Sequence, residues 1–418
     1  MFFAVVSDTK KATLGVTPRY GRATRLAAPD GEEARVLNSI KRTVVFSAGV
    51  IFAVGIGTAC ADSIADWQAH KIPAAEPKIT YSGEPVTLKF AHPSPPASMV
   101  PPVWRAGFKW LEEATNGKLK IKEYAGGTLH GAKDGFKAAR SGISDYSYCM
   151  VAFEARGFPM TKVFELPFVM PTNRMAGVKV VSELATKYFR KEFERQGTYF
   201  GLMALVGASD IMSRKPIRKL EDLKGLKVLA QGFEPEAAKA LGFVLVNIPY
   251  PEIYTSLQQG IVDAVLWVDP GFIPYKIYEL AKYHTTLGLS AQHIDTCVNR
   301  KTFDALPPDL KQAFYDFQPR MAYSIVKTIG VDFHTKAKGI YEKNGVEMIT
   351  LPKEELARWR KALEPVVNKW AEDQEKKGVP AKALLADIKE LTAKYNDMSA
   401  DEIFKTIIED PAQGRIKF

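Results

Sequence analysis

The sequence lacks the short motifs that usually mark a catalytic centre. It contains no Walker phosphate-binding loop, no G-x-S-x-G nucleophile elbow and no H-x-x-x-H pair among its six histidines. The glycine-rich run GVIFAVGIG at 49–57 does not lie between a strand and a helix, so no dinucleotide site is expected. We therefore predict a protein that is not an enzyme and that holds neither a metal nor a cofactor. An enzyme whose catalytic groups come together from distant segments is the alternative.

Cysteine is also scarce. The three residues, Cys60, Cys149 and Cys297, are too few for a disulfide scaffold and lack the spacing of a metal site. Cys149 and Cys297 fall in expected strands, where buried free thiols are common. We expect free thiols there, and a disulfide, which an oxidising compartment would permit, is the alternative.

Positive charge is abundant, with 57 Lys and Arg against 47 Asp and Glu and a net charge of +10. The basic stretches at 213–227 and 358–377 interleave with acidic residues, so they are typical of solvated faces and no nucleic-acid partner is expected. A hydrophobic content of 46% and a charged content of 25% indicate a folded globular protein. The length of 418 residues suggests two or three domains.

Part of the positive charge belongs to the first 61 residues. Residues 1–42 hold eight basic and four acidic residues, and no charged residue follows until Asp62. A basic pair, an apolar run at 43–57 and a small-residue Ala-x-Ala site are typical of a secretory signal, which we expect to be cleaved after about Ala61. The apolar run is too short for a membrane anchor and ends in the cleavage site. We therefore expect a periplasmic protein with no stable membrane insertion after cleavage.

Strand and helix patterns alternate in the next part of the chain. Alternating apolar residues predict strands at 86–92, 118–124 and 143–150, with helices over 101–117 and 131–142 between them. This β-α-β-α-β order indicates a parallel α/β sheet.

A second unit of the same kind is expected further along. The order of helix, glycine, branched residue, aspartate and strand at 138–148 recurs at 256–267, which favours two lobes of related topology. The apolar stretch 199–212 is expected to be a strand that crosses between them, and the chain beyond about 302 is mostly helical. The predicted class is α/β with two lobes, crossing hinge strands and a long helical C-terminal region. The expected boundaries are a leader at 1–61, a tether at 62–85, lobe I at 86–206 plus 294–335, lobe II at 207–293 plus 336–385, and a helical tail at 386–418.

Several blocks of sequence carry a family resemblance. They are KFAHPSPPAS (89–98), FELPFVM (164–170), SRKPIRKLEDLKGLKVLAQG (213–232), PEIYTSLQQGIVDAVLWVDP (251–270) and VNRKTFDALPPDLK (298–311). Over about 86–385 the chain resembles the solute-binding proteins of TRAP (tripartite ATP-independent periplasmic) transporters, in their dicarboxylate-type family. Gln231 and the Trp-Val-x-Pro run at Trp267 are similar to the keto-acid-binding subgroup. The resemblance implies a periplasmic-binding-protein-like fold that closes over a small organic acid and delivers it to TRAP permease subunits in the membrane.

The family's charged ligand contacts are missing at two positions. The resemblance implies an arginine that clamps the ligand carboxylate where Leu229 stands, and an acid that helps hold a bridging cation where Leu266 stands. Our hypothesis is a less anionic ligand, aromatic or otherwise bulky, that stacks on Trp267. Another cation, Arg156 or Arg214, could instead have taken over the carboxylate, or binding could be altered or lost.

Further contributors to a cleft follow from position alone. Open α/β sheets bind ligands at the carboxyl ends of their strands, so His92, Tyr148 and Asp210 are expected to face the cleft. The alternatives are packing roles for His92 and Tyr148 and a capping role for Asp210. Closure is expected at the crossing strands, near 206–212 and 292–296. An ABC-linked or sensory binding module is the competing functional class.

Overall fold

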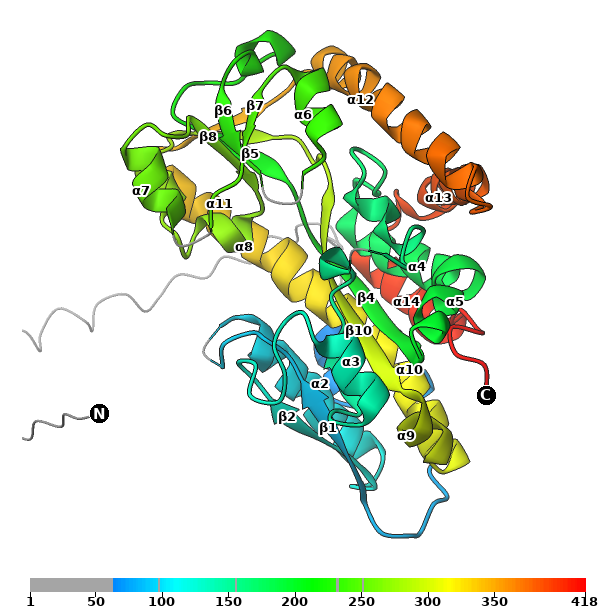
Figure 1. Cartoon of the computed structure of the whole chain (residues 1–418). Coiled ribbons are helices and arrows are strands. Elements are labelled where there is room, and N and C mark those ends of the chain that lie inside the picture. Colours follow the sequence, from blue (N-terminus) through cyan, green and yellow to red (C-terminus); the bar gives the residue numbers. More distant parts are fainter. Residues whose placement is uncertain (1–62, 97, 155, 231–232, 250–251) are drawn as a thin grey trace, which may run out of the picture. The chain divides into compact units, whose positions relative to one another are not determined.

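The computed structural model describes residues 63–418, apart from 97, 155, 231–232 and 250–251 (Figure 1). The expected leader and Gln231 lie outside the described residues. Two β-sheets organise the described chain, as the α/β prediction requires. We call the five-stranded sheet and the elements packed on it lobe I, and the six-stranded sheet with its elements lobe II.

The sheet of lobe I has the strand order β2-β1-β3-β10-β4. Its strands are β1 (Val86–Ala91), β2 (Leu119–Tyr124), β3 (Tyr146–Tyr148), β4 (Thr198–Ala208) and β10 (Ala291–Asn299). β1 is parallel to β2 and β3, whereas β10 is antiparallel to β3 and β4. The parallel sheet predicted from residue 86 onward is confirmed. β3 is shorter than the strand expected at 143–150, and Asp145, just before it, accepts the Lys89 N–H with its side chain at 2.8 Å.

Helices cover this sheet. They are α2 (Val100–Ala114), α3 (Gly135–Ser141), α4 (Arg174–Leu184), α5 (Arg190–Arg195), α9 (Arg300–Ala305) and α10 (Pro308–Ile325), with short helical turns at η2 (Val151–Phe153), η3 (Thr161–Glu165) and η4 (Ala185–Phe189). In α2, Trp104, Phe108 and Leu111 recur at helical spacing and are all buried in the lobe I core. Gly117 follows the helix with φ of +73°, a left-handed conformation that favours glycine.

The sheet of lobe II has the order β11-β9-β5-β8-β6-β7. Its strands are β5 (Asp210–Ser213), β6 (Lys227–Leu229), β7 (Val244–Val246), β8 (Ala264–Trp267), β9 (Tyr283–Thr286) and β11 (Glu347–Thr350). The associated helices are α6 (Pro235–Leu241), α7 (Ile253–Gln258), α8 (Asp269–Phe272), α11 (Phe333–Lys343) and α12 (Lys353–Glu375), with short turns at η5 (Leu220–Leu223) and η7 (Ile277–Glu279). β6 is parallel to β7 and β8, and β5 is antiparallel to β8 and β9.

Two connections cross between the sheets. β4 ends in lobe I and β5 begins in lobe II after the single residue Ser209, so the predicted crossing strand at 199–212 is confirmed. The second crossing is residues 287–290, ahead of the expected 292–296, which lies inside β10. The crossings bond to each other, because Ser209 donates its N–H to Ser290 O at 2.9 Å and accepts the Leu289 N–H at 3.0 Å.

A continuous helical run also passes from one lobe to the other (Figure 1). α10 packs on β4 of lobe I, a π-helical segment η8 (Val326–Asp332) follows, and α11 packs against β11 and α8 of lobe II. Gly330 in η8 lies close to the first crossing: a Cβ there would be 3.3 Å from Val206 O. The run therefore touches both sheets and one crossing strand.

The segment expected to be a tether is instead part of lobe I. Within α1 (Ser63–Gln68), Trp67 is fully buried, with its ring centroid 4.5 Å from that of Trp110. After η1 (Pro73–Ala75), the Asp309 carboxylate accepts the N–H groups of Thr80 and Tyr81 at 2.6 and 2.7 Å. The prediction was wrong because the packing partners lie far away in sequence.

The C-terminal residues do not form a separate tail either. α13 (Ala381–Tyr395) and α14 (Ala400–Glu409) pack on α4, and Tyr395, Phe404 and Ile416 are buried in the lobe I core. α12 leads to them from lobe II. Its Trp359 is in the lobe II core, and its Trp370 packs against the lobe I core. α12 is therefore another element that spans the two lobes.

Candidate functional site

Trp267 is the last residue of β8 and pairs with Asp210, the first residue of β5. The indole is half-buried, and its ring centroid lies 5.6 Å from that of Tyr275. It packs over Gly271, where a Cβ would come within 2.3 Å of the indole. Glycine at 271 thus leaves room for an aromatic surface at the carboxyl end of a strand, where open α/β sheets bind ligands.

The two leucines that replace charged groups of the relatives do not lie side by side. Leu229 is 1% exposed and belongs to the core cluster of Met212, Val265 and Phe272, against which Trp267 packs. Leu266 is 6% exposed and belongs to the cluster on the opposite face of the sheet, with Ile211 and Trp359. Successive strand residues point to opposite faces, so Leu229 shares a face with Trp267 and Leu266 does not. The two leucines thus lie on opposite faces of the sheet, and their expected contacts with a ligand stay predictions.

A buried polar network lies immediately after Trp267, and sequence reasoning did not find it. Asp269 is 5% exposed and accepts hydrogen bonds from Tyr341 Oη at 2.9 Å and from His334 Nδ1. His284 Nε2 lies 3.4 Å from Asp269 Oδ1 and 3.9 Å from Asp210 Oδ2. Burial opposes ionisation, but the neighbouring imidazoles outweigh it and hold the pKa of Asp269 below its ordinary value.

The same network has His284 at its centre. Burial disfavours the imidazolium of His284, yet Asp269 and Asp210 outweigh it and raise the pKa of His284. The network ties the residues after β8 to α11. The Trp267 turn is therefore anchored to the helical run that continues into lobe I.

Asp210 joins the first crossing to the second by hydrogen bonds. It is 2% exposed, and Oδ1 accepts the N–H groups of Leu287 and Gly288 at 2.7 and 2.9 Å. The capping alternative considered for Asp210 was correct in kind, but the capped residues are 287–288 of the second crossing. Asp210 stands beside Trp267 in the sheet, with its carboxylate already occupied by backbone donors.

His92 and Tyr148 come together at the carboxyl ends of β1 and β3, but as packed residues. Their ring centroids are 5.4 Å apart, and both side chains are buried. Tyr148 Oη accepts the Trp104 Nε1 hydrogen bond at 2.7 Å, and burial raises the pKa of Tyr148. His92 Nε2 lies 2.9 Å from Glu123 Oε1, and burial lowers the pKa of His92. The packing alternative thus describes their contacts in this structure.

A second ionisable cluster at this end of the lobe I sheet was also missed. His293 Nδ1 lies 2.8 Å from Asp295 Oδ1, and its Nε2 lies 3.6 Å from Glu165 Oε1. Asp295 Oδ2 also accepts the Val151 N–H at 3.0 Å, just beyond β3. Burial opposes the imidazolium, but Asp295 and Glu165 outweigh it and raise the pKa of His293 to about 10. Glu165 belongs to the FELPFVM block, which was the feature of the sequence that could have pointed to this cluster.

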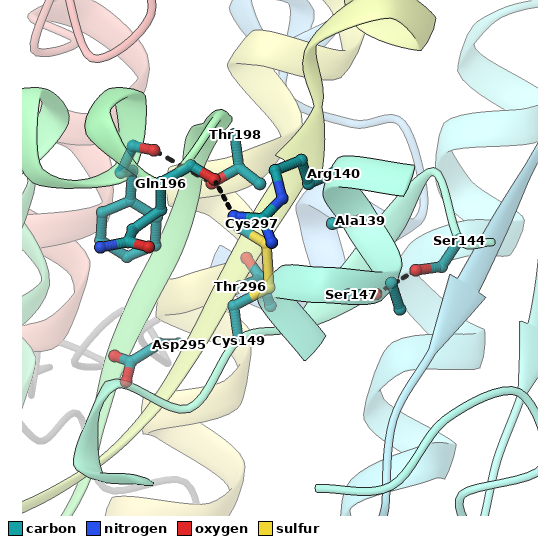
Figure 2. The surroundings of a disulfide bond; sticks show 12 residues. Ala139, Arg140, Ser144, Ser147, Cys149, Gln196, Thr198, Asp295, Thr296 and Cys297 are labelled. Atoms are coloured by element: carbon teal, nitrogen blue, oxygen red, sulfur yellow. Dashed lines mark hydrogen bonds between the residues drawn. A yellow bond between two sulfur atoms is a disulfide. The ribbon is translucent and has the colours of Figure 1, made fainter. Parts of the chain in front are cut away.

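Cys149 and Cys297 form a disulfide, so the expectation of free thiols was wrong (Figure 2). Both residues are fully buried, and their Cα atoms are 5.6 Å apart. The bridge joins the residue after β3 to the neighbouring strand β10. Figure 2 shows Asp295 and Thr296 on β10 beside it. The cross-link fixes the end of β3 at the strand edge where Tyr148 and Asp295 lie.

The two cations considered as replacements for the missing arginine differ in position. Arg214 follows β5, at the end where Ser213 pairs with Ala264, the first residue of β8. Trp267 is at the other end of β8, so Arg214 lies at the wrong edge of the sheet for a shared ligand. Arg156 is exposed in the segment after β3 and η2, on the carboxyl-end side of lobe I.

Comparison with known proteins assigns the fold to a family. Residues 108–374 match the family model described as bacterial extracellular solute-binding protein, family 7. The chain belongs to this family. It is a solute-binding protein of the TRAP transporter type, and its relatives are periplasmic receptors for small organic acids.

Two relatives are named for the solutes that they bind. The C4-dicarboxylate-binding periplasmic protein DctP of Rhodobacter capsulatus is 27% identical over 299 residues, which cover 69% of this chain and 87% of DctP. The 2,3-diketo-L-gulonate-binding periplasmic protein YiaO of Escherichia coli is 26% identical over 249 residues, which cover 57% of this chain and 74% of YiaO.

Solved structures share the two-lobe architecture. A TRAP periplasmic solute-binding protein from Desulfovibrio salexigens superposes with a TM-score of 0.69 and 26% identity, covering 75% of this chain and 98% of that one. A Rhodoferax ferrireducens protein crystallised with copurified benzoate has a TM-score of 0.63 at 23% identity and covers 74% of this chain and 98% of that one. A marine-metagenome protein specific for aromatic acids, in complex with 3-hydroxybenzoate, has a TM-score of 0.66 at 20% identity and covers 75% and 100%.

Two features are absent from the described part of this solute-binding protein. Among those residues, no group of three or more His, Cys, Asp or Glu side chains is arranged to hold a metal ion. No helix within them has both the length and the apolar character needed to cross a membrane.

Proposed function

We propose that this solute-binding protein captures a small aromatic or otherwise bulky organic acid between its lobes and delivers it to TRAP permease subunits, without chemistry of its own. Ligand contacts from both lobes would favour a closed state by differential affinity, and closure would bend the chain at the two crossings. The leader would direct export and be cleaved after about Ala61. The observation that carries the ligand assignment is Trp267, whose half-buried indole ends β8 on the same sheet face as Leu229.

The surroundings of Trp267 favour an apolar ligand. Leu229 fills with aliphatic side chain the position at which relatives place a carboxylate clamp, and Tyr275 adds a second ring beside the indole. A charge-assisted pair is worth about 2–3 kcal/mol, so its loss weakens a second carboxylate contact substantially. An aromatic ring on Trp267 would recover about 0.5–1.5 kcal/mol by stacking, in addition to the apolar area that it buries.

Charge near Trp267 points the same way. The aspartates and histidines of the network beside Trp267 are Asp210, Asp269, His284 and His334, and they pair with one another. Their two carboxylates are balanced at most by two imidazolium groups, so this network offers no surplus of positive charge to a dicarboxylate. A ligand with one carboxylate and an aromatic ring fits this balance better.

The structural relatives lend independent support. The Rhodoferax ferrireducens protein holds benzoate, and the marine-metagenome protein binds 3-hydroxybenzoate. We assign Trp267 and Gln231 as ligand contacts and Leu229 as part of the wall beneath the ligand. Arg156 is the proposed partner for the single carboxylate from lobe I. His92, Tyr148, Asp210 and Leu266 would support the site without touching the ligand.

The test is a ligand panel on the full-length chain produced with its leader and stripped of carried-over solute by unfolding and refolding without reductant. Benzoate, 3-hydroxybenzoate and phenylacetate should raise the melting temperature, whereas succinate, malate and pyruvate should have little effect. Tight binding of the C4-dicarboxylates by the wild type would contradict the proposal. Incubation of each bound acid with the protein, followed by product analysis, tests for turnover, and no product is expected.

A pair of substitutions locates the site. Trp267→Ala should weaken the affinity for the best aromatic acid at least tenfold, and Trp267→Phe should retain most of it because a phenyl ring still stacks. Trp370→Ala is the matched control, since Trp370 is a partly buried indole on α12 that packs against the lobe I core. Unchanged affinity in Trp267→Ala would remove the indole from the site.

A further inference from the structure

A cavity of about 250 Å³ lies against the two crossing segments. Its wall comes from the residues before and in the first turn of α4, from both crossings and from the β11–α12 region of lobe II. The lining residues are Met170, Pro171, Thr172, Arg174, Ala208, Asp210, Thr286, Leu287, Gly288, Thr350, Leu351, Leu356 and Arg360. We propose that this cavity is a second binding site, for a small multivalent oxyanion, and that its occupant regulates closure of the lobes.

The cavity is separate from the proposed solute site. Leu287 and Leu351 belong to the lobe II core cluster that contains Leu266 and Trp359 of α12. Trp267 packs against the cluster on the other face of the same sheet. Among the described residues, neither Trp267 nor Leu229 lines the cavity, although Asp210, which pairs with Trp267, does. A solute on the indole would therefore lie beside the cavity and not in it.

Two arginines give the cavity its charge. Arg360 lies over the Phe168 ring at 4.4 Å, and its Nη1 donates to Phe168 O at 3.5 Å. Arg360 is exposed, but partial desolvation by the surrounding protein lowers its pKa, with no carboxylate opposing the shift. Arg174 donates through Nη1 to Gly330 O. Within the described parts of 63–418, neither guanidinium has a carboxylate within ion-pair distance.

A neighbouring arginine shows the contrast. Arg358 is on the same helix two residues earlier, and it forms ion pairs with Glu221 and with Glu355, the latter at 2.7 Å. Its surroundings raise the pKa of Arg358, the reverse of the shift at Arg360. An arginine that lines a cavity without an acidic partner keeps several N–H donors available, and guanidinium forks match oxyanions bidentately.

Asp210 is the acidic residue among those that line the cavity, and its single carboxylate does not balance the two arginines. Its Oδ1 is occupied by the N–H groups of Leu287 and Gly288, and its Oδ2 lies 3.9 Å from His284. The net charge of the side chains that line the cavity is therefore positive. Thr286 and Thr350 add hydroxyl groups to the wall. A phosphate or sulfate ion with a few waters suits this combination of charge, donors and volume.

Occupancy would act on closure because the wall is shared. Arg174 belongs to lobe I, Arg360 to the helix that spans both lobes, and Leu287 and Gly288 to a crossing. An ion that binds both arginines is sensitive to the angle between these elements, so it should stabilise one lobe arrangement over the other. By linkage, the ion then changes the solute affinity by the same factor that the solute changes the ion affinity.

The experiment measures inorganic phosphate and sulfate binding to the full-length chain by calorimetry, with sodium chloride at matched ionic strength as the reference. No solute is present, so the result does not depend on the identity of the ligand. Binding by the wild type should weaken at least tenfold in Arg360→Gln and in Arg174→Gln, and Arg360→Lys should retain part of it. Arg358→Gln is the matched control and should leave anion binding unchanged.

Two results would overturn the proposal: no anion binding beyond the chloride reference, or equal binding in the wild type and in Arg174→Gln/Arg360→Gln. Regulation is tested by measuring solute affinity with and without phosphate, with a change of at least threefold expected in the wild type and none in Arg360→Gln. Equal solute affinity with and without bound phosphate would refute the regulatory part. Failure of every aromatic acid to bind would instead contradict the proposed solute, while the anion result would stand.

Discussion

Removal of the Cys149–Cys297 bridge should lower the free energy of unfolding by a large amount for a change of two small side chains. The two residues are separated by 148 positions, and both are fully buried in lobe I. A cross-link over a loop of that length lowers the entropy of the unfolded chain, which corresponds to about 5 kcal/mol at 25 °C. Because a typical folded domain is stable by only about 5–15 kcal/mol, such a loss is a large part of the total.

The design separates the cross-link from packing. Cys149→Ala and Cys297→Ala each break the bridge, so each single variant should lose most of the 5 kcal/mol, and the double variant should lose only about 1 kcal/mol more. Two independent packing defects would instead add. Urea unfolding without reductant gives the midpoint and its slope, and the slope should rise in all three variants because their unfolded chains are less compact.

The native bridge should also resist reductant, since neither sulfur is accessible until lobe I opens. Dithiothreitol should therefore lower the urea midpoint of the wild type to that of the double variant only when it is added during unfolding. Peptide mapping without reduction provides a direct check. Recovery of Cys149 and Cys297 as unlinked peptides from the native protein, or additive costs for the two single variants, would refute this reasoning.

Three further predictions concern single residues. Against the effect of burial, Asp295 and Glu165 raise the pKa of His293 to about 10. The charged imidazole therefore stabilises the folded protein fully below about pH 6.5, and this contribution is lost as the pH rises towards 10. The urea midpoint should fall over that range in the wild type and much less in His293→Gln. Asp210→Ala leaves the Leu287 and Gly288 N–H groups unpaired and should cost about 2–3 kcal/mol in urea unfolding, and a cost near zero would show that the crossing does not depend on it. Gly271→Ala places a Cβ 2.3 Å from the Trp267 indole and should weaken solute binding, measured by calorimetry, about tenfold. The control is Gly339→Ala in α11, where a Cβ meets open space. It should leave solute binding unchanged and either leave the free energy of unfolding unchanged or raise it by up to about 1 kcal/mol.

The sequence predicts the parts of the fold whose signals are local. β1 alternates apolar and polar residues from Val86 to Phe90, β2 does so from Leu119 to Lys122, and α2 buries Trp104, Phe108 and Leu111 at helical spacing. The crossing strand was also predictable, because 199–212 is too long and too apolar for a surface loop. These features need no knowledge of what packs against them.

The wrong predictions share a dependence on distant partners. Trp67 stands in a segment rich in proline and alanine, and its ring contacts are Trp110 and Phe404. Cys149 meets Cys297 only because β10 returns to lobe I and pairs with β3 after the chain has passed through lobe II. Asp210 caps N–H groups 77 and 78 residues further along the chain. Local patterns carry no information about such pairings.

Part of the candidate site could have been resolved from the sequence alone. Leu266 and Trp267 are consecutive residues of a strand, so they must point to opposite faces of the sheet. The family resemblance suggested both as ligand positions, and strand geometry was the stronger constraint. Asp269 was likewise within the quoted WVDP run, but its role depends on His334 and Tyr341 in α11, which the run does not reveal.

The resulting picture links the solute and anion proposals through shared elements. Two residues after Trp267, Asp269 is bonded to α11, and α11 is joined through η8 to α10 of lobe I. Trp267 also pairs with Asp210, which holds the second crossing at Leu287 and Gly288, and those two residues line the cavity between Arg174 and Arg360. A solute on the indole and an ion on the arginines would therefore act on neighbouring parts of lobe II and on the same crossing. If closure of the lobes moves that crossing, the solute must alter the affinity for the ion and the ion must alter the affinity for the solute. The ion raises the solute affinity if the two arginines bind it more tightly in the closed arrangement, and lowers it if they bind it more tightly in the open one.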